Sequence, residues 1–215
     1  MTVTILPATD ADVTDIFTIA SRAFKRNEEF FTAQFTDHDT PEGRLKGGQR
    51  FLEQGQADPN IILMKAVDDG TGKIAGFARW ILFMNGSLPV PGLETRHWQT
   101  VEDAEYAHGL LVEFVKYRQE HLAKTNGTML SLDICAIDPD YQRRGIGNEL
   151  VKWGTAKADE LGIDAVVESS VCGKGLYEKH GFIFQRDVVL PVNERFLSRP
   201  DSKFAWLVRP KTVQS

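Results

Sequence analysis

The chain has 215 residues, of which 42% are hydrophobic and 26% are charged, and these values exclude a grossly disordered chain, a collagen and a coiled coil. This length suits one elaborated domain or two small ones, and a chain of this size folds without a metal ion or a disulfide. The net charge of −5 argues against a general nucleic-acid-binding protein, although a local basic cluster could still hold a phosphate.

Cysteine usage and the absence of targeting signals indicate where the protein works. Cys135 and Cys172 form no CxxC pair, which favours a reducing compartment. The first twenty residues carry three aspartates and lack a basic start, so we expect no secretory signal. The longest uncharged stretch, 80–93, contains two prolines and is too short for a membrane span. We therefore expect a cytoplasmic protein without a membrane segment.

The first quarter of the chain carries one strand signal and two helix signals. Val3–Pro7 is expected to be a short strand that proline closes, and hydrophobic residues then recur at helical spacing from Val13 to Phe24. A second helix is expected over about 42–54, because Thr40-Pro41 is a typical helix start. The periodicity does not resolve 27–39.

Two strands and a long helix are expected next. Residues 61–67 and 73–83 are rich in hydrophobic side chains and flank a cluster of Asp, Gly and Thr, which predicts a β-hairpin. Residues 84–98 are rich in proline and glycine and are expected to form a loop. The helix is expected over about 101–123, with Asn126-Gly127 as its stop signal.

The second half of the chain has a clearer pattern. The expected strands are 129–137, 164–169, 182–190 and 204–208, and the expected helices are 145–161 and 174–180. Together with the first half, this order indicates one α/β or α+β domain over residues 1–215, with a mixed sheet.

The segment 142–148, with the sequence QRRGIGN, joins an expected strand to an expected helix. The first backbone N–H groups of a helix have no partner within it, and the helix dipole adds about half a positive charge there. Gly145 and Gly147 lack the Cβ atoms that would block a close approach, and Arg143 and Arg144 add donors suited to phosphate. The segment is either a pyrophosphate cradle or an ordinary strand–turn–helix connection.

Two other phosphate-binding motifs do not fit the chain. The dinucleotide-binding pattern GxGxxG requires a third glycine, where Leu150 stands. The P-loop requires GxxxxGK[ST], and Gly173-Lys174-Gly175 lacks both the earlier glycine and the Ser or Thr. Gly147 and Gly154 also share a helix face with Leu150, so close packing on the sheet could explain both glycines.

The run Gln142-Arg143-Arg144-Gly145-Ile146-Gly147 resembles the Q/R-x-x-G-x-G/A signature of the GCN5-related N-acetyltransferase (GNAT) superfamily. The strand 130–137 with Asp138-Pro139 is similar to that family's fourth strand, and 176–182, LYEKHGF, is similar to its short fourth helix. The likeness is clearest over 129–190. It implies an acetyl-CoA-binding core there, within a single domain whose central sheet is mixed, mostly antiparallel and flanked by helices, with an extra long helix at about 101–123.

The resemblance implies acetyl-CoA as co-substrate, no metal ion, and a set of site residues. Backbone groups of three strand residues would pair with the pantetheine arm: Cys135, Ala136 and Ile137. Backbone amides of the next segment would hold the pyrophosphate: Gln142, Arg143, Arg144, Gly145, Ile146, Gly147 and Asn148. The side chain of Arg143 or Arg144 would also reach a phosphate. Tyr177 takes the family position of the general acid that protonates the CoA thiolate.

The general base has two candidates. Asp133 lies within an otherwise apolar strand, where an unpaired carboxylate is costly unless it faces a cleft or a partner. Glu168 lies at the end of the next expected strand. Each carboxylate is equally explained as a salt-bridged or strand-end group, so a third interpretation is that neither is the base.

The expected reaction is acetyl transfer from acetyl-CoA to a primary amine by direct attack in a ternary complex. A small-molecule amine is favoured over a protein, no nucleic-acid or membrane partner is expected, and a homodimer contact through helix 101–123 stays open. The acceptor cleft is expected between 24–41, 84–105 and 190–203. The alternatives are a catalytically silent acyl-CoA-binding sensor or regulatory protein, and the same fold with a longer acyl donor or a hydroxyl acceptor.

Overall fold

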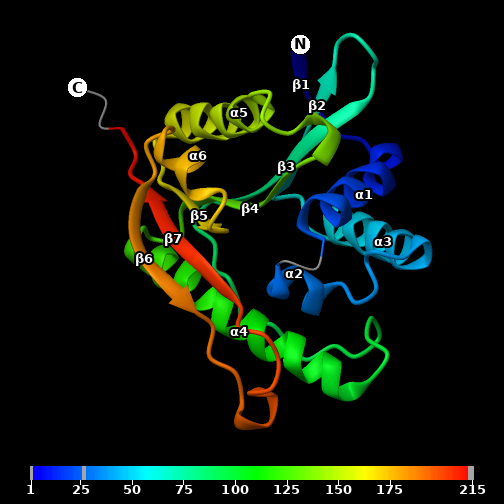
Figure 1. Ribbon diagram of the computed structural model, residues 1–215. Helices are drawn as coiled ribbons and strands as arrows, with labels where there is room; N and C mark the ends of the chain where they lie inside the picture. Colours follow the sequence, from blue (N-terminus) through cyan, green and yellow to red (C-terminus); the bar gives the residue numbers. More distant parts are fainter. Residues whose placement is uncertain (1, 26–27, 213–215) are drawn as a thin grey trace.

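The computed structural model describes residues 2–25 and 28–212. Within them, a seven-stranded sheet has the order β1-β2-β3-β4-β5-β7-β6 (Figure 1). Its strands are β1 (Val3–Pro7), β2 (Ile61–Asp68), β3 (Ile74–Phe83), β4 (Met129–Ile137), β5 (Ala165–Ser169), β6 (Ile183–Val189) and β7 (Lys203–Arg209). Neighbouring strands are antiparallel except β4 and β5, which are parallel. The expected hairpin and the mixed, mostly antiparallel sheet are confirmed.

The helices follow the predicted order, with one addition. They are α1 (Val13–Phe24), α2 (Glu29–Gln34), α3 (Pro41–Ala57), α4 (Val101–Lys124), α5 (Ile146–Leu161) and α6 (Lys174–Glu178). The addition is α2, in the segment that periodicity did not resolve. The predicted start of α3 is confirmed, because the Thr40 side chain accepts a hydrogen bond from the Gly43 amide at 3.0 Å. None of the helices in the described part of the chain has the length and hydrophobicity of a membrane span.

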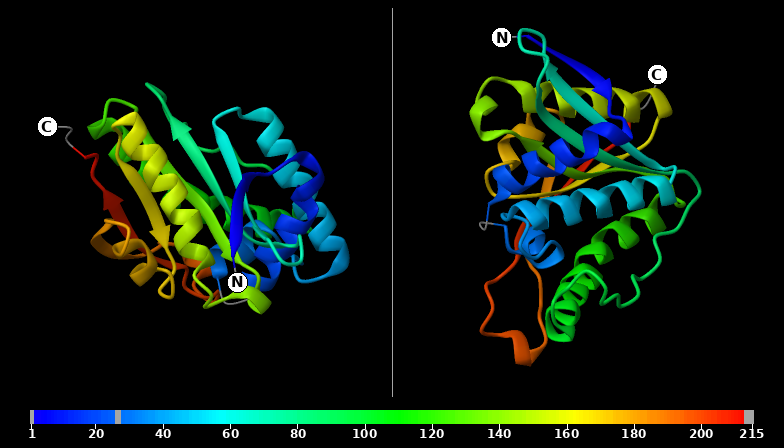
Figure 2. Two further views of the ribbon diagram at one scale, coloured as in Figure 1. Left: turned by 90° about the horizontal axis from the view of Figure 1, so that it is seen from above. Right: turned by 90° about the vertical axis from the view of Figure 1, so that its right-hand side faces the viewer.

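Helices cover both faces of the sheet (Figures 1 and 2). On one face, α5 packs over the sheet through Leu150 and Val151. On the other face, α1 and α3 cover the half that contains β2, β3 and β4, with Phe17 in the core between them. On that same face α4 covers the half that contains β5 and β7, where Phe114 packs in one cluster with Trp206. The apolar stripes of these four helices thus explain the layers.

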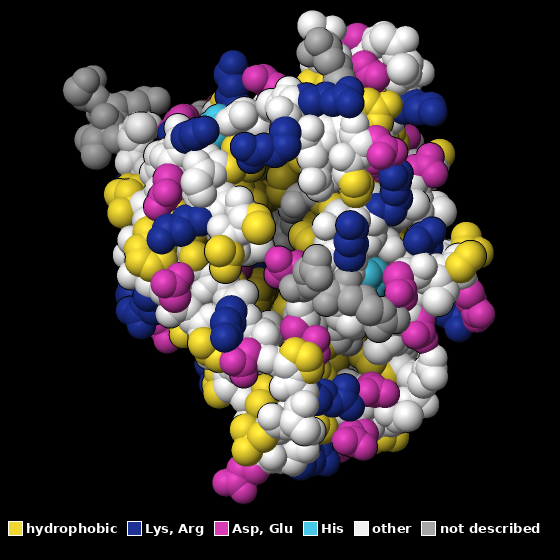
Figure 3. Space-filling model, viewed as in Figure 1, with side chains coloured by type: hydrophobic (Ala, Val, Ile, Leu, Met, Phe, Trp, Pro, Cys, Tyr) yellow, Lys and Arg dark blue, Asp and Glu magenta, His cyan; other side chains and the backbone are white. Residues whose placement is uncertain are grey.

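The sheet opens between β4 and β5. These strands pair only from Leu130 to Leu132, against Ala165–Val167, although β4 continues to Ile137. On its other edge β4 stays paired with β3 as far as Ile137. The backbone of residues 133–137 therefore has no strand partner on the side of β5. Figure 3, seen from the direction of Figure 1, shows a hollow in the molecule with hydrophobic side chains at its bottom.

A β-bulge at Asp133 changes the face to which β4 side chains point. Arg79 and Trp80, adjacent in β3, pair with Ile134 and Leu132, so Asp133 has no opposite residue. One extra residue shifts the alternation of a strand by one. The core beneath α5 accordingly contains even-numbered residues of β4 before the bulge and odd-numbered residues after it: Leu130, Leu132, Cys135 and Ile137.

The close approach of α5 to the sheet depends on Gly154. A Cβ atom at this position would lie 2.0 Å from Cζ2 of Trp80, a fully buried ring of β3. The packing explanation is thus confirmed for Gly154. A Cβ atom at Gly147 would instead meet the side chain of Leu176, from α6, at 3.1 Å. Gly147 therefore lies near α6 at the start of the helix, next to the opening between β4 and β5.

Candidate active site

The backbone at the start of α5 presents several N–H groups that have no partner among the described residues. Arg143 and Gly145 have positive φ angles of 62° and 87°, and Gly145 is the N-cap of the helix. The amides of Arg143, Gly145, Ile146 and Gly147 donate no hydrogen bond to another described residue. Successive free amides at a helix N-terminus, in a stretch with left-handed residues, form an anion-binding concavity. This segment can therefore hold a pyrophosphate.

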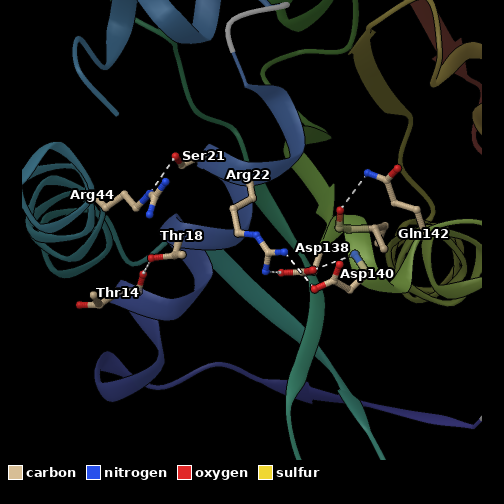
Figure 4. A network of polar contacts seen from close by, with 9 residues as sticks. Thr14, Thr18, Ser21, Arg22, Arg44, Asp138, Asp140 and Gln142 are labelled. Atoms are coloured by element: carbon tan, nitrogen blue, oxygen red, sulfur yellow. Dashed lines mark hydrogen bonds and ion pairs between the residues drawn. The ribbon is translucent and has the colours of Figure 1, made fainter. Parts of the chain in front are cut away.

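Arg22 of α1 anchors the turn that leads into this segment (Figure 4). Its Nη1 lies 2.7 Å from Oδ2 of Asp138, and its Nη2 lies 2.9 Å from Oδ2 of Asp140. Gln142 donates from Nε2 to the Ile137 carbonyl oxygen at 3.2 Å, which ties the segment to the end of β4. The motif identifies Gln142 but gives no hint of Arg22, which is 116 residues away from Asp138 in the chain.

The residues expected to meet the pantetheine arm lie on the unpaired edge of β4. Cys135 and Ile137 face the core beneath α5, whereas Ala136 packs on the side of α1. An extended chain with amide groups can add to such an edge as a further strand. Burial raises the pKa of the Cys135 thiol to about 12, so this side chain stays neutral and acts as a small packing residue.

Tyr177 comes to the same opening from α6. Its ring is buried and contacts Phe182 edge-on, with ring centroids 5.8 Å apart. Burial, together with the nearby Cys135 of β4, raises the pKa of Tyr177 well above its ordinary value. The Tyr177 hydroxyl forms no hydrogen bond with a residue that the structure describes. A neutral phenol with a free donor thus lies beside the unpaired part of β4.

Asp133 and Glu168 come together on the side of the sheet that α4 covers. Arg118 of α4 donates from Nε and Nη2 to the two Glu168 oxygens at 2.9 and 2.8 Å, and from Nη1 to Asp133 Oδ1 at 2.9 Å. Arg79 lies 3.5 Å from Oδ2 of Asp133. Two carboxylates and two guanidinium groups thus form a cluster with no formal net charge.

The two carboxyl groups of the cluster differ in access and in pKa. The side chains of Arg118 and Glu168 are 4% and 1% exposed, whereas that of Asp133 is 20% exposed. Burial opposes ionisation of Asp133, but Arg79 and Arg118 outweigh it and lower the pKa of Asp133. At Glu168 burial prevails over Arg118 and raises the pKa. Asp133 is therefore the more accessible of the two carboxylates and the one whose charged form its neighbours favour.

A family model matches the part of the chain that contains most of these elements. It is described as Acetyltransferase (GNAT) domain and matches residues 94–184, which contain α4, β4, the 142–148 segment, β5 and α6. This part of the chain therefore resembles a GNAT acetyltransferase domain. No protein of curated function matches it by sequence.

Solved structures share the GNAT fold over nearly the whole chain at low sequence identity. A Corynebacterium glutamicum protein described as histone acetyltransferase HPA2 and related acetyltransferase is 19% identical, with a TM-score of 0.64 and coverage of 100% of this chain and 99% of that chain. Arylalkylamine N-acetyltransferase 2 of Aedes aegypti is 12% identical, with a TM-score of 0.69 and coverage of 98% and 99%. A phosphinothricin acetyltransferase of Sinorhizobium meliloti, solved with AcCoA, is 16% identical, with a TM-score of 0.56 and coverage of 98% and 89%.

In this protein, α4 contacts two of the segments expected around the acceptor cleft. From 24–41, Phe30 stacks on Phe114 of α4 with ring centroids 4.2 Å apart; residues 26 and 27 of that segment lie outside the described residues. The Tyr106 hydroxyl of α4 donates to Glu29 at 3.0 Å and approaches the Pro200 carbonyl oxygen of 190–203 at 3.3 Å. The long helix therefore joins both segments beside the carboxylate cluster.

Sequence reasoning missed Arg118, although one signal was available. The apolar stripe of the long helix passes through Leu111, Phe114, Val115 and Leu122, and position 118 falls on the same face at helical spacing. A charged residue on a buried face requires partners of opposite charge. The two unexplained carboxylates, Asp133 and Glu168, were the available partners.

Proposed function

We propose that this protein is an N-acetyltransferase that moves an acetyl group from acetyl-CoA to the amino group of a small molecule. The observation that carries the proposal is the coincidence of two unsatisfied backbone surfaces. The amides of Gly145, Ile146 and Gly147, which have no partner among the described residues, adjoin the unpaired edge of residues 133–137 at the end of β4. A ligand with a pyrophosphate followed by an amide-containing arm complements both surfaces.

The chain offers acetyl-CoA one binding surface for each of its parts. The amides of the 142–148 segment would hold the pyrophosphate, and the side chain of Arg143 or Arg144 would add charge to it. Backbone groups of Cys135, Ala136 and Ile137 would pair with the pantetheine arm. Acetyl-CoA supplies an acetyl group that its thioester already activates. A neighbour solved with AcCoA supports this cofactor assignment.

Asp133 is the residue that we propose to receive the amine. The amine nitrogen forms a bond to the acetyl carbonyl carbon, the carbon–sulfur bond breaks, the nitrogen loses one proton and the sulfur leaves as thiolate. Asp133 is ionised and accessible, so it orients the amine and accepts its proton through a water molecule. Glu168 is shielded by Arg118, and we assign it the role of holding that guanidinium in place.

Tyr177 is proposed to stabilise the leaving thiolate. Because burial keeps its pKa well above 10, a complete proton transfer to a thiolate of ordinary pKa, about 8.5, is uphill. A hydrogen bond from the neutral phenol to the developing charge carries no such cost. We therefore expect Tyr177 to act chiefly as a hydrogen-bond donor in the transition state, with the proton reaching the sulfur afterwards.

A small amine and a single domain complete the proposal. The arylalkylamine and phosphinothricin acetyltransferases among the structural neighbours are named for small acceptors, which supports a small-molecule amine here. Strands from both ends of the chain, β1 and β7, belong to one sheet, which supports a single domain over residues 1–215.

The test is a thermal-shift titration with acetyl-CoA. Binding to the native state alone adds about 2.7 kcal/mol of stability at 100 times Kd. We expect a clear upward shift for the native protein and none for Gly145→Asp, which places a charge and a strained side chain at the anion site. Gly92→Asp is the matched control, because a Cβ atom at Gly92 meets nothing within 4 Å. The absence of a shift with the native protein would refute the cofactor assignment.

A measurement of turnover distinguishes an active acetyltransferase from a catalytically silent acyl-CoA sensor. A panel of small amines is offered with acetyl-CoA, and thiol release is followed. Tyr177→Phe is expected to bind acetyl-CoA with unchanged affinity and to lose roughly 10²-fold in kcat. A protein that binds acetyl-CoA and releases no thiol with any amine would favour the sensor.

A further inference from the structure

A second cavity lies away from the opening between β4 and β5. It has a volume of about 570 Å³ and is bounded by α3, by the loop residues 91–98 and by Leu111 of α4. The right-hand view of Figure 2 shows α3 and α4 with this loop beside them. The cavity is on the face of the sheet opposite α5. It shares no lining residue with the 142–148 segment.

Arg50 is held rigidly in the wall of this cavity. Its guanidinium carbon lies 4.8 Å from the ring centroid of Phe35 and 5.0 Å from that of Trp98. Its Nη1 donates to the Gln34 carbonyl oxygen at 2.6 Å. A guanidinium has five N–H donors, and this is the one bond that Arg50 makes to a described residue. Its remaining donors have no acceptor among the described residues.

Arg50 forms no ion pair with a described carboxylate. Burial lowers the pKa of its guanidinium to about 10, although Glu94 opposes the shift. Both carboxylates of the cavity lie nearer to Arg96, which is 3.3 Å from Glu94 and 3.8 Å from Glu53. Arg50 is thus a partly buried charge without a direct partner among the described residues, which is costly.

We infer that this cavity binds a small organic molecule through a single carboxylate, with Arg50 as the anchor. A planar guanidinium held between two rings presents its edge to a planar acceptor, which suits a bidentate carboxylate. Since Glu53 and Glu94 balance the two guanidinium groups of the cavity, a monoanion that Arg50 holds directly is favoured over a doubly charged phosphate, which both carboxylates would repel more strongly. Trp98 and Leu111 supply apolar surface for the rest of the ligand.

The cavity reaches the carboxylate cluster through one side chain. Gln54 lines the cavity and accepts a hydrogen bond from Arg79 Nη1 at 2.9 Å, and Arg79 lies 3.5 Å from Asp133. The cavity around Arg50 is nonetheless separate from the proposed acetyl-CoA site, so the test of ligand binding in the cavity does not depend on turnover.

The experiment follows binding of 4-fluorobenzoate by ¹⁹F NMR line broadening at constant ionic strength, with and without acetyl-CoA. We expect saturable binding to the native protein in both conditions. Arg50→Gln keeps a donor for the Gln34 carbonyl but removes the charge, and we expect at least tenfold weaker binding. Arg44→Gln makes the same change on the same helix outside the cavity, and we expect binding equal to that of the native protein.

Two further probes test the ligand class. The neutral 4-fluorobenzamide should bind at least tenfold more weakly than the benzoate, and so should 4-fluorophenyl phosphate. Equal binding of benzoate to the native protein and to Arg50→Gln would overturn the inference. So would equal binding of the benzamide, tighter binding of the phosphate, or no saturable binding of benzoate below about 10 mM.

Discussion

Arg118 donates hydrogen bonds to both carboxylate oxygens of Glu168, and both side chains are almost wholly excluded from solvent. A third donor of the same guanidinium reaches Asp133. Asp133 belongs to β4 and Glu168 to β5, so one side chain of α4 joins both strands beyond the point where their pairing ends. The cluster thus supports the opening in which we place the reaction.

Arg118→Leu is expected to destabilise the protein by about 3–5 kcal/mol, because it leaves Glu168 buried without its partner. The measurement is urea unfolding. Lys116→Ala is the control, since Lys116 is half-exposed on the same helix and its pair with Glu113 contributes about 0.5 kcal/mol or less. The double variant Arg118→Leu with Glu168→Leu should recover part of the loss. A cost for Arg118→Leu no greater than that of the control would contradict this account.

Gly154→Ala and Gly109→Ala should have effects of opposite sign. At Gly154 the new Cβ atom would collide with the buried Trp80 ring, and we expect a loss of about 1–3 kcal/mol. At Gly109, in α4, a Cβ atom meets nothing within 4 Å, and the gain in helix propensity is about 0.5–1 kcal/mol. Thermal unfolding of both variants decides the matter; a stabilised Gly154→Ala would mean that α5 can move away from the sheet.

His121 is expected to make stability fall in mild acid. Burial lowers the pKa of His121. Oδ2 of Asp164 lies 3.0 Å from Nε2 of His121 and favours the protonated ring, but burial prevails. The unfolded chain then binds a proton more readily than the folded one, so stability is lost as pH falls through about 6.5 towards the folded pKa. His121→Gln should give a shallower decline between about pH 7.5 and 5.5. His97 and His180, whose pKa values burial also lowers, leave part of the slope.

Arg22→Gln is expected to weaken acetyl-CoA binding about three- to tenfold, as measured by calorimetry, because the turn before the anion site loses its anchor to α1. Stability should change by about 1 kcal/mol or less, since Arg22 is partly exposed. Thr18→Ala, one turn earlier on α1 and with its hydroxyl bonded within that helix, is the control. Unchanged affinity in Arg22→Gln would remove Arg22 from the cofactor-binding account.

Local signals explain why so much of the fold and of the anion site could be predicted. The helix start at Thr40-Pro41, the stop after the long helix and the 142–147 signature each depend on residues within a few positions of one another. Their structures follow from capping, turn and dipole preferences that the sequence displays directly. The segment that became α2 has six residues and a run of aromatic side chains, too short for a helical period to appear.

Contacts between residues far apart in the chain could not be predicted from the sequence. Arg118 meets a residue 50 positions away at Glu168, and Arg22 meets one 116 positions away at Asp138. The bulge at Asp133 depends on the register between β3 and β4, which hydrophobic alternation alone does not determine. The roles of Asp133, Glu168 and Tyr177 therefore needed the tertiary arrangement before any of them could be argued.

The short pairing of β4 with β5 divides the sheet into two parts. Three residue pairs, Leu130–Leu132 against Ala165–Val167, connect a part of four strands to a part of three. No hydrogen bond within either part of the sheet crosses the gap, so a change in the width of the gap would leave those bonds intact. A ligand that pairs with β4 in this gap would extend the row of backbone hydrogen bonds. The two parts of the sheet would then be connected along a greater length.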